Sequence, residues 1–174
     1  MRSLWIFGYG SLVFRPDFDF VRRQNAWVRG FERRFFQGST DHRGVPSAPG
    51  RVVTLIPQNA AKVGGVAFEI ADDRRDEILE RLDFRERGGY TRLDLELVDG
   101  SGRPLTRAIT YVATPENPNW LGDAPLDDIA RQVRGAIGPS GRNVDYVLEL
   151  ERALRELGIE DENVAALAAL VRGA

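Results

Sequence analysis

The distribution of apolar residues predicts mainly strands over the first two thirds of the chain and helices over the last third. The predicted strands cover residues 4–7, 26–36, 51–56, 63–70, 91–98 and 105–112. The first is a continuous apolar run, typical of a strand buried on both faces, whereas residues 91–98 alternate and place three leucines on one face. Turn sequences at residues 57–59 and 99–102 separate neighbouring strands, and the second predicts a hairpin.

The predicted helices cover residues 72–82, 126–136, 143–157 and 162–171. Residues that commonly mark helix ends stand at their boundaries. Asp72 and Asp73 are expected to cap the first helix, and Pro125 suits the first turn of the second. Asn143 is expected to be the N-cap of the third helix, and Gly158 its C-terminal stop.

Strands followed by a helical third predict an α+β fold, and the length of 174 residues fits one domain over residues 1–174. Gly88 and Gly89 are expected to end the helix that begins near residue 72. Residues 37–50 are rich in glycine and proline and predict a long loop. We expect this loop to be functional, because long loops inside compact domains usually are.

Composition excludes several kinds of site. The formal net charge of −2 argues against nucleic-acid binding. The absence of cysteine excludes a disulfide or a thiolate nucleophile, and the single histidine, His42, excludes a multi-histidine zinc site, so no metal is expected. No apolar run approaches the roughly 20 residues of a membrane span and the first residues do not resemble a signal peptide, so we expect a cytoplasmic protein without membrane contact.

Two segments carry the candidate chemistry. IFGYGSL, residues 6–12, is a short strand that enters a loop with two glycines and a hydroxyl group. Such a loop can bend sharply and point backbone N–H groups at an anion or an oxyanion, although a plain turn at a strand end fits the same letters. DFRERGGY, residues 83–90, places the carboxylate of Glu86 at the end of a helical segment. Together the two segments offer an anion cradle and one candidate base.

These segments and four further blocks closely resemble the ChaC-type glutathione-specific γ-glutamylcyclotransferase family. The further blocks are QGSTDHRGVP (37–46), PGRVVTL (49–55), NPNWLG (117–122) and GPSGRNVDY (138–146). They follow the family's order over nearly the whole chain. The resemblance implies an α+β fold with a mixed, barrel-like sheet and flanking helices.

The resemblance also implies a reaction. The γ-glutamyl bond of glutathione would be cleaved by intramolecular cyclisation, giving 5-oxoproline and cysteinylglycine without a cofactor. Glu86 is the general base that the resemblance implies. The expected substrate-binding residues are Ile6, Phe7, Gly8, Tyr9, Gly10, Ser11, Leu12, Arg51, Tyr111 and Tyr146. Glutathione is the expected small-molecule partner of a monomer or weak homodimer.

Other roles remain open for several of these residues. Asp83 is a second candidate base, although it fits a charge partner better. Arg85 and Arg87 are expected to point outward, because a guanidinium beside Glu86 would lower the pKa of that carboxyl and weaken the base. Two alternatives to the implied function also stay open. One is cyclisation of other γ-glutamyl peptides or amines, and the other is a non-catalytic regulatory binding protein.

Two arginines are candidates to hold a substrate carboxylate. A surface position is as good a reading for Arg51 and a better one for Arg43. His42 fits a loop-organising residue better than a catalyst, and both Tyr111 and Tyr146 fit buried core aromatics nearly as well as substrate contacts.

Overall fold

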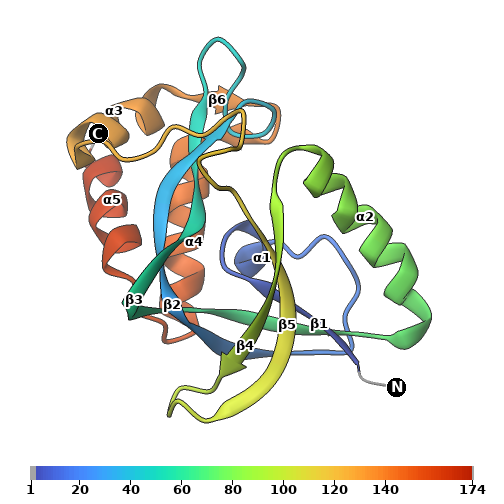
Figure 1. Cartoon of the computed structure of the whole chain (residues 1–174). Helices are drawn as coiled ribbons and strands as arrows, with labels where there is room; N and C mark the ends of the chain where they lie inside the picture. Colours follow the sequence, from blue (N-terminus) through green and yellow to red (C-terminus); the bar gives the residue numbers. More distant parts are fainter. Residues whose placement is uncertain (1–2, 174) are drawn as a thin grey trace.

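Five strands close into a barrel in this computed structural model, which describes residues 3–173 except for the side chain of Glu86 (Figure 1). The strands are β1 (Leu4–Gly8), β2 (Arg22–Ser39), β3 (Gly50–Ile70), β4 (Thr91–Val98) and β5 (Pro104–Val112). Their order is β1-β3-β2-β4-β5, and the barrel closes where β5 runs parallel to β1 with Ile6 opposite Ile109. All other strand pairs of the barrel are antiparallel, which confirms the mixed, barrel-like sheet.

The predicted turn at residues 57–59 is wrong, because β3 runs through it. Phe31 lies opposite Pro57 and Arg29 lies opposite Lys62, so residues 58–61 of β3 face only Gly30 of β2. Gly30 has a positive φ of 84°, which glycine adopts without strain. The turn-forming residues are therefore absorbed in an irregular bulge, where a proline without an N–H group is tolerated.

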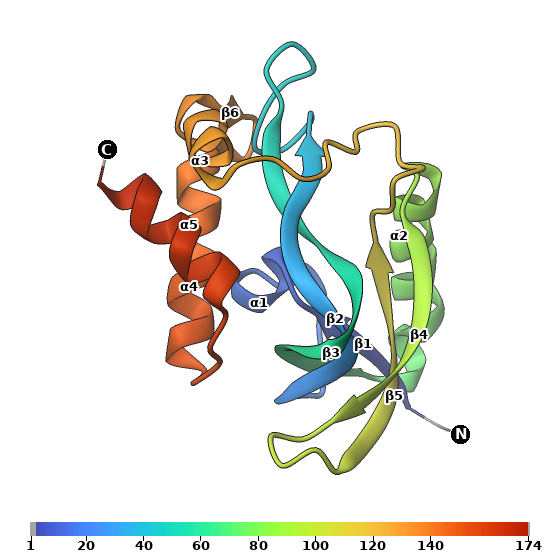
Figure 2. The same cartoon turned by 60° about the vertical axis from the view of Figure 1, so that its left-hand side comes forward.

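Helices lie on two sides of the barrel. They are α1 (Ser11–Phe14), η1 (Asp72–Arg74), α2 (Arg75–Arg87), α3 (Leu126–Gly135), α4 (Asn143–Glu156) and α5 (Glu162–Arg172), and a small hairpin of β6 (Ile137–Gly138) and β7 (Gly141–Arg142) precedes α4. Figure 2 shows α3, α4 and α5 together on one side and α2 on the other. Leu150, Leu154 and Leu167 are fully buried where the C-terminal helices pack. None of the helices between residues 3 and 173 is long and apolar enough to cross a membrane.

The helix ends follow the sequence signals only in part. Gly158, with φ of 71°, ends α4 as expected: its N–H group bonds to Arg155 O and the next N–H group bonds to Leu154 O. Asp72 and Asp73 do not cap their helix, since the N-cap position is Ala71 without a side-chain bond. Asn143 is the first residue of α4, and its buried side chain bonds to the backbone N and O of Arg51 instead.

Candidate active site

A cavity of about 520 Å³ lies between the end of β1 and the end of α2. Residues 6–12 form one wall, and Arg85 and Gly88 contribute to the opposite wall. The loop that follows β2 contributes Arg43, and α4 contributes Tyr146. Of the ten substrate-binding residues expected from the sequence, nine line this cavity and Arg51 does not.

The glycine-rich segment turns sharply from β1 into α1. A Cβ atom on Gly8 would lie 2.8 Å from Leu12 Cβ and 3.2 Å from the ring of Phe68, so only glycine fits there. Because α1 begins at Ser11, its first N–H groups have no carbonyl partner within the helix. The segment therefore brings backbone donors to the wall of the cavity.

Tyr9 is held rigidly in this segment. Its hydroxyl donates to Tyr111 O over 2.6 Å, and its backbone oxygen accepts a bond from Arg33 Nε over 2.9 Å. Burial raises the pKa of Tyr9 far above its usual value, so its hydroxyl is neutral at physiological pH. Tyr9 is thus a fixed hydrogen-bond donor rather than a base.

Sequence reasoning missed Arg33, whose side chain supports the glycine-rich segment through its bond to Tyr9 O. Its guanidinium also bonds to Gly64 O and pairs with Asp161 at 2.5 Å. The signal that could have found it is the alternation within β2, because Arg33 shares the inward face with Phe31 and Phe35. Burial lowers the pKa of Arg33, and Asp161 opposes that shift.

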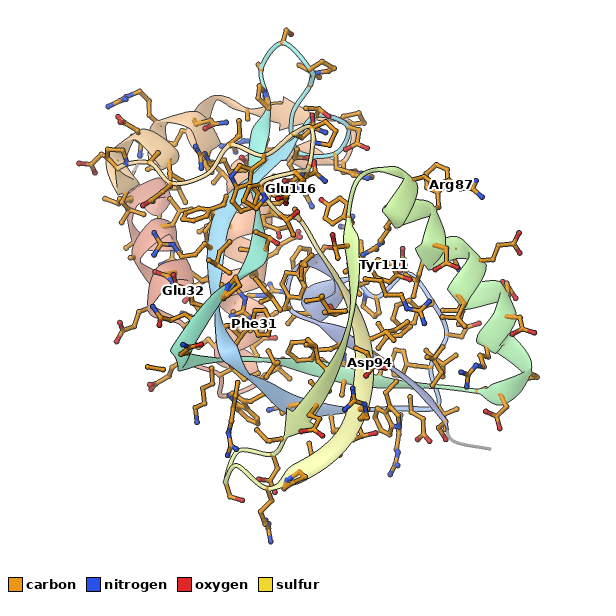
Figure 3. The ribbon with its side chains drawn as sticks, in the orientation of Figure 1. Phe31, Glu32, Arg87, Asp94, Tyr111 and Glu116 are labelled. Carbon is orange, nitrogen blue, oxygen red and sulfur yellow. The ribbon has the colours of Figure 1, made fainter. Side chains whose placement is uncertain are left out.

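The two other expected tyrosines have defined partners. Tyr111 lies in the interior between β5 and α2 (Figure 3), and its hydroxyl donates to Asp83 Oδ1 over 3.1 Å. Asp83 also lies 3.6 Å from Arg92 and is absent from the cavity lining, so the structure places it as a charge partner. The hydroxyl of Tyr146 accepts a bond from Val53 N, and burial raises its pKa well above the usual value.

The two candidate arginines lie in different places. The Arg51 guanidinium bonds to Gln132 Oε1, Phe35 O and Gly122 O over 2.7–2.9 Å, away from the cavity. Arg43 lines the cavity, bonds to Arg142 O, and lies 5.9 Å from the centre of the Tyr146 ring. The structure therefore brings Arg43, and not Arg51, to the candidate site.

Glu86 lies in the last turn of α2, and its side chain is outside the described part of the structure. The helix ends directly after it, where the N–H groups of Gly88 and Tyr90 both bond to Arg85 O. Arg87 is exposed and points away from the barrel (Figure 3), as expected. The same expectation is wrong for Arg85, which lines the cavity and lies 3.8 Å from Asp17.

The described lining has a slight excess of positive charge. It contains Arg15, Arg43 and Arg85 against Asp17 and Asp41. Such a lining suits a ligand with carboxylate groups. Within residues 3–173, apart from Glu86, no group of three or more His, Asp or Glu side chains could hold a metal ion.

His42 lies at the rim of the cavity and connects two loops. Its Nδ1 lies 3.0 Å from Ser140 Oγ, and its backbone oxygen accepts a bond from Ser140 N. Its side chain is 70% exposed. These contacts fit the loop-organising role expected from the sequence.

The barrel with its helices and cavity is the fold of γ-glutamylcyclotransferases. The crystal structure of a selenomethionine-labelled γ-glutamyl cyclotransferase specific to glutathione from yeast matches 99% of this chain and 97% of that chain, with a TM-score of 0.90 and 30% identity. The glutathione-specific gamma-glutamylcyclotransferase 1 of Danio rerio is 44% identical over 88% of this chain and 80% of its own length. Gamma-glutamylcyclotransferase 2-3 of Arabidopsis thaliana is 42% identical over 98% of this chain and 89% of its own.

A family model described as ChaC-like protein matches residues 4–174. The chain belongs to this family.

Proposed function

We propose that this protein cleaves the γ-glutamyl bond of glutathione by cyclisation and releases 5-oxoproline and cysteinylglycine. The observation that carries the proposal is the cavity, which is lined by the IFGYGSL segment and, opposite it, by the end of α2. The chain that contains this cavity belongs to the ChaC-like family. The similarity to glutathione-specific relatives over nearly the whole length supports glutathione as the substrate.

The reaction requires three things of the site. The α-ammonium group of the substrate must lose a proton, and the resulting amine must attack the side-chain carbonyl carbon of the same molecule. The tetrahedral oxyanion then collapses, the bond to the cysteine nitrogen breaks, and that nitrogen gains a proton. Since nucleophile and electrophile belong to one molecule, no covalent enzyme intermediate or cofactor is needed. The protein holds the folded γ-glutamyl arm, moves the protons and stabilises the oxyanion.

Glu86 is the proposed general base. An α-ammonium group with a pKa near 8 does not attack a carbonyl, so a base must remove its proton. Glu86 is in the last turn of α2, between Arg85 and Gly88 of the cavity lining. As a carboxylate it attracts the ammonium group, and after accepting one proton it returns it to the departing nitrogen.

Backbone donors and an arginine complete the proposed site. The N–H groups of the segment around Gly10 and Ser11 would bind the α-carboxylate of the substrate or the oxyanion. Arg43 would hold a substrate carboxylate, because its buried guanidinium lies at the cavity. Tyr111 and Tyr146 shape the remaining wall. The single-domain organisation, the cytoplasmic location and the monomeric or weakly dimeric state stay predictions.

Product analysis of wild type and Glu86→Gln with reduced glutathione tests the proposal. We expect 5-oxoproline and cysteinylglycine from wild type and a loss of at least about 10³-fold in turnover for the variant, because the amide cannot accept the proton. Asp83→Asn is the matched control and should retain most activity. Wild-type rates in Glu86→Gln would remove Glu86 from the mechanism. If glutathione stays intact while other γ-glutamyl peptides or amines are converted, those compounds and not glutathione are the substrates.

A further inference from the structure

Two side-chain amides, those of Gln37 and Asn117, connect the cavity to the end of α2. Asn117, in the NPNWLG block, accepts the N–H of Asn119 at its Oδ1 over 2.9 Å and donates from Nδ2 to Gly88 O over 3.3 Å. These two bonds fix which end of the Asn117 amide carries oxygen. Gln37 of β2 contacts the same Oδ1 at 3.0 Å, so it must present its Nε2 there. The orientation of the Gln37 amide follows from the network.

The oxygen of this amide is left without a partner. Gln37 is 1% exposed and lines the cavity, and its Oε1 has no hydrogen-bond partner among the described residues. Tyr90 also lines the cavity; burial raises the pKa of Tyr90, and Arg85 and a hydrogen bond with the Gln37 side chain oppose that shift. Buried acceptors in native proteins are almost always paired, so an unpaired one at a cavity indicates a bound donor.

We infer that Oε1 of Gln37 accepts a hydrogen bond from the α-ammonium group of the γ-glutamyl substrate. The inference rests on the proposed function. Gln37 is connected through Asn117 to Gly88, two residues beyond the proposed base, so acceptor and base belong to the same end of the cavity. An ammonium group has three N–H bonds and gives only one proton to the base. A neutral amide oxygen holds another N–H without removing its proton.

This contact makes Gln37 a specificity residue for the free α-amine. A ligand that lacks the amine leaves the buried oxygen unpaired, and sites built around a polar group reject such ligands strongly. Asn117 acts as a positioning residue, since its Oδ1 holds the Gln37 amide in the productive orientation.

Calorimetry with two probes tests the inference in a Glu86→Gln background, where glutathione is not consumed. The probes are reduced glutathione and glutaryl-cysteinylglycine, in which hydrogen replaces the α-ammonium group. Gln37→Met should weaken glutathione binding by about 10- to 100-fold, the value of a hydrogen bond to a charged group. The same variant should change binding of glutaryl-cysteinylglycine by less than about 2-fold.

Equal losses for both probes would mean general damage to the cavity and would overturn the inference. Unchanged glutathione binding would also overturn it, because water would then satisfy Oε1. Gln132→Met is the matched control outside the cavity and should affect neither probe selectively. If Gln37→Met does not fold, Gln37→Asn withdraws the amide by one methylene and the same comparison applies. Wild-type turnover is measured first: if glutathione is not converted, the proposed function fails and this inference fails with it.

Discussion

Arg43 and Arg51 are both only 6% exposed, yet their guanidinium groups meet different surroundings. Arg51 is enclosed by two backbone carbonyls and Gln132, and it fastens β3 to α3 and to the segment before that helix. Arg43 lies at the cavity with one carbonyl bond and with Glu149 3.8 Å away. We therefore expect Arg51 to act in stability, and we propose Arg43 for substrate binding.

Arg51→Met and Arg43→Met should separate these roles. We expect Arg51→Met to lower the free energy of unfolding by about 3 kcal/mol, because it leaves buried acceptors unpaired at about 1–3 kcal/mol each. Its KM for glutathione should hardly change. Arg43→Met should raise KM about 10-fold or more, since a charged hydrogen bond to the ligand is lost. Urea unfolding and steady-state kinetics measure both effects, and a rise in KM for Arg51→Met alone would reverse the assignment.

For single residues, the sequence predicted placements that depend on neighbouring residues better than placements that depend on partners far along the chain. The seven residues from Ile6 to Leu12 share one turn, so their common placement at the cavity follows from the local sequence. The role of Arg51 depends on Gln132, 81 positions away, and that of Arg33 on Asp161, 128 positions away. A single sequence, read by itself, carries no signal for such distant pairs.

The end of α2 is the element on which the proposed base depends. Gly89 has φ of 88°, and a Cβ atom there would lie 2.9 Å from Pro118 Cδ and 3.1 Å from Asn117 Nδ2. The helix and the NPNWLG block thus fit together only with glycine at this position. Gly88 has no positive φ, and a Cβ atom there would approach only Arg85 O, at 3.3 Å.

Gly89→Ala and Gly88→Ala form a matched pair at this helix end. Gly89→Ala should lower stability by about 1–3 kcal/mol, because alanine is strained at positive φ and collides with the neighbouring block. It should also lower kcat, since relief of the collision shifts the last turn of α2. Gly88→Ala should cost less than about 1 kcal/mol. Thermal unfolding and kcat provide the comparison, and equal effects of the two variants would contradict it.

Elements with a strong local pattern were predicted well. The hairpin of β4 and β5, the end of α4 at Gly158 and the last three helices all occur as expected. The predicted break in β3 failed because pairing with β2 on both sides of the bulge outweighs the local turn preference. The short helix α1 was not predicted, since four residues carry too little periodicity.

At the scale of the whole molecule, a buried ion pair connects the C-terminal helices to the barrel and to the glycine-rich turn. Asp161 caps α5 by accepting from Val164 N, and it pairs with Arg33, whose Nε supports Tyr9. The Arg33 side chain is fully buried and that of Asp161 is 11% exposed. This ion pair therefore links the packing of α5 to the glycine-rich turn that lines the cavity.

Asp161→Asn tests this dependence, because asparagine can still cap the helix while the charge is lost. We expect a loss of about 3–5 kcal/mol, since the Arg33 cation remains buried without a counter-charge. Asp128→Asn is the control: it removes the same charge from an exposed pair with Arg131 and should cost at most about 1 kcal/mol. Urea unfolding of both variants decides, and similar small losses would mean that Arg33 does not depend on Asp161.

In the proposed reaction the substrate's own amine, and not water, attacks the γ-glutamyl carbonyl. The most direct measurement is mass spectrometry of the products formed from reduced glutathione in water enriched in ¹⁸O. Cyclisation predicts cysteinylglycine together with 5-oxoproline that carries no ¹⁸O from the solvent. Glutamate labelled with ¹⁸O in its side-chain carboxylate would show hydrolysis and contradict cyclisation.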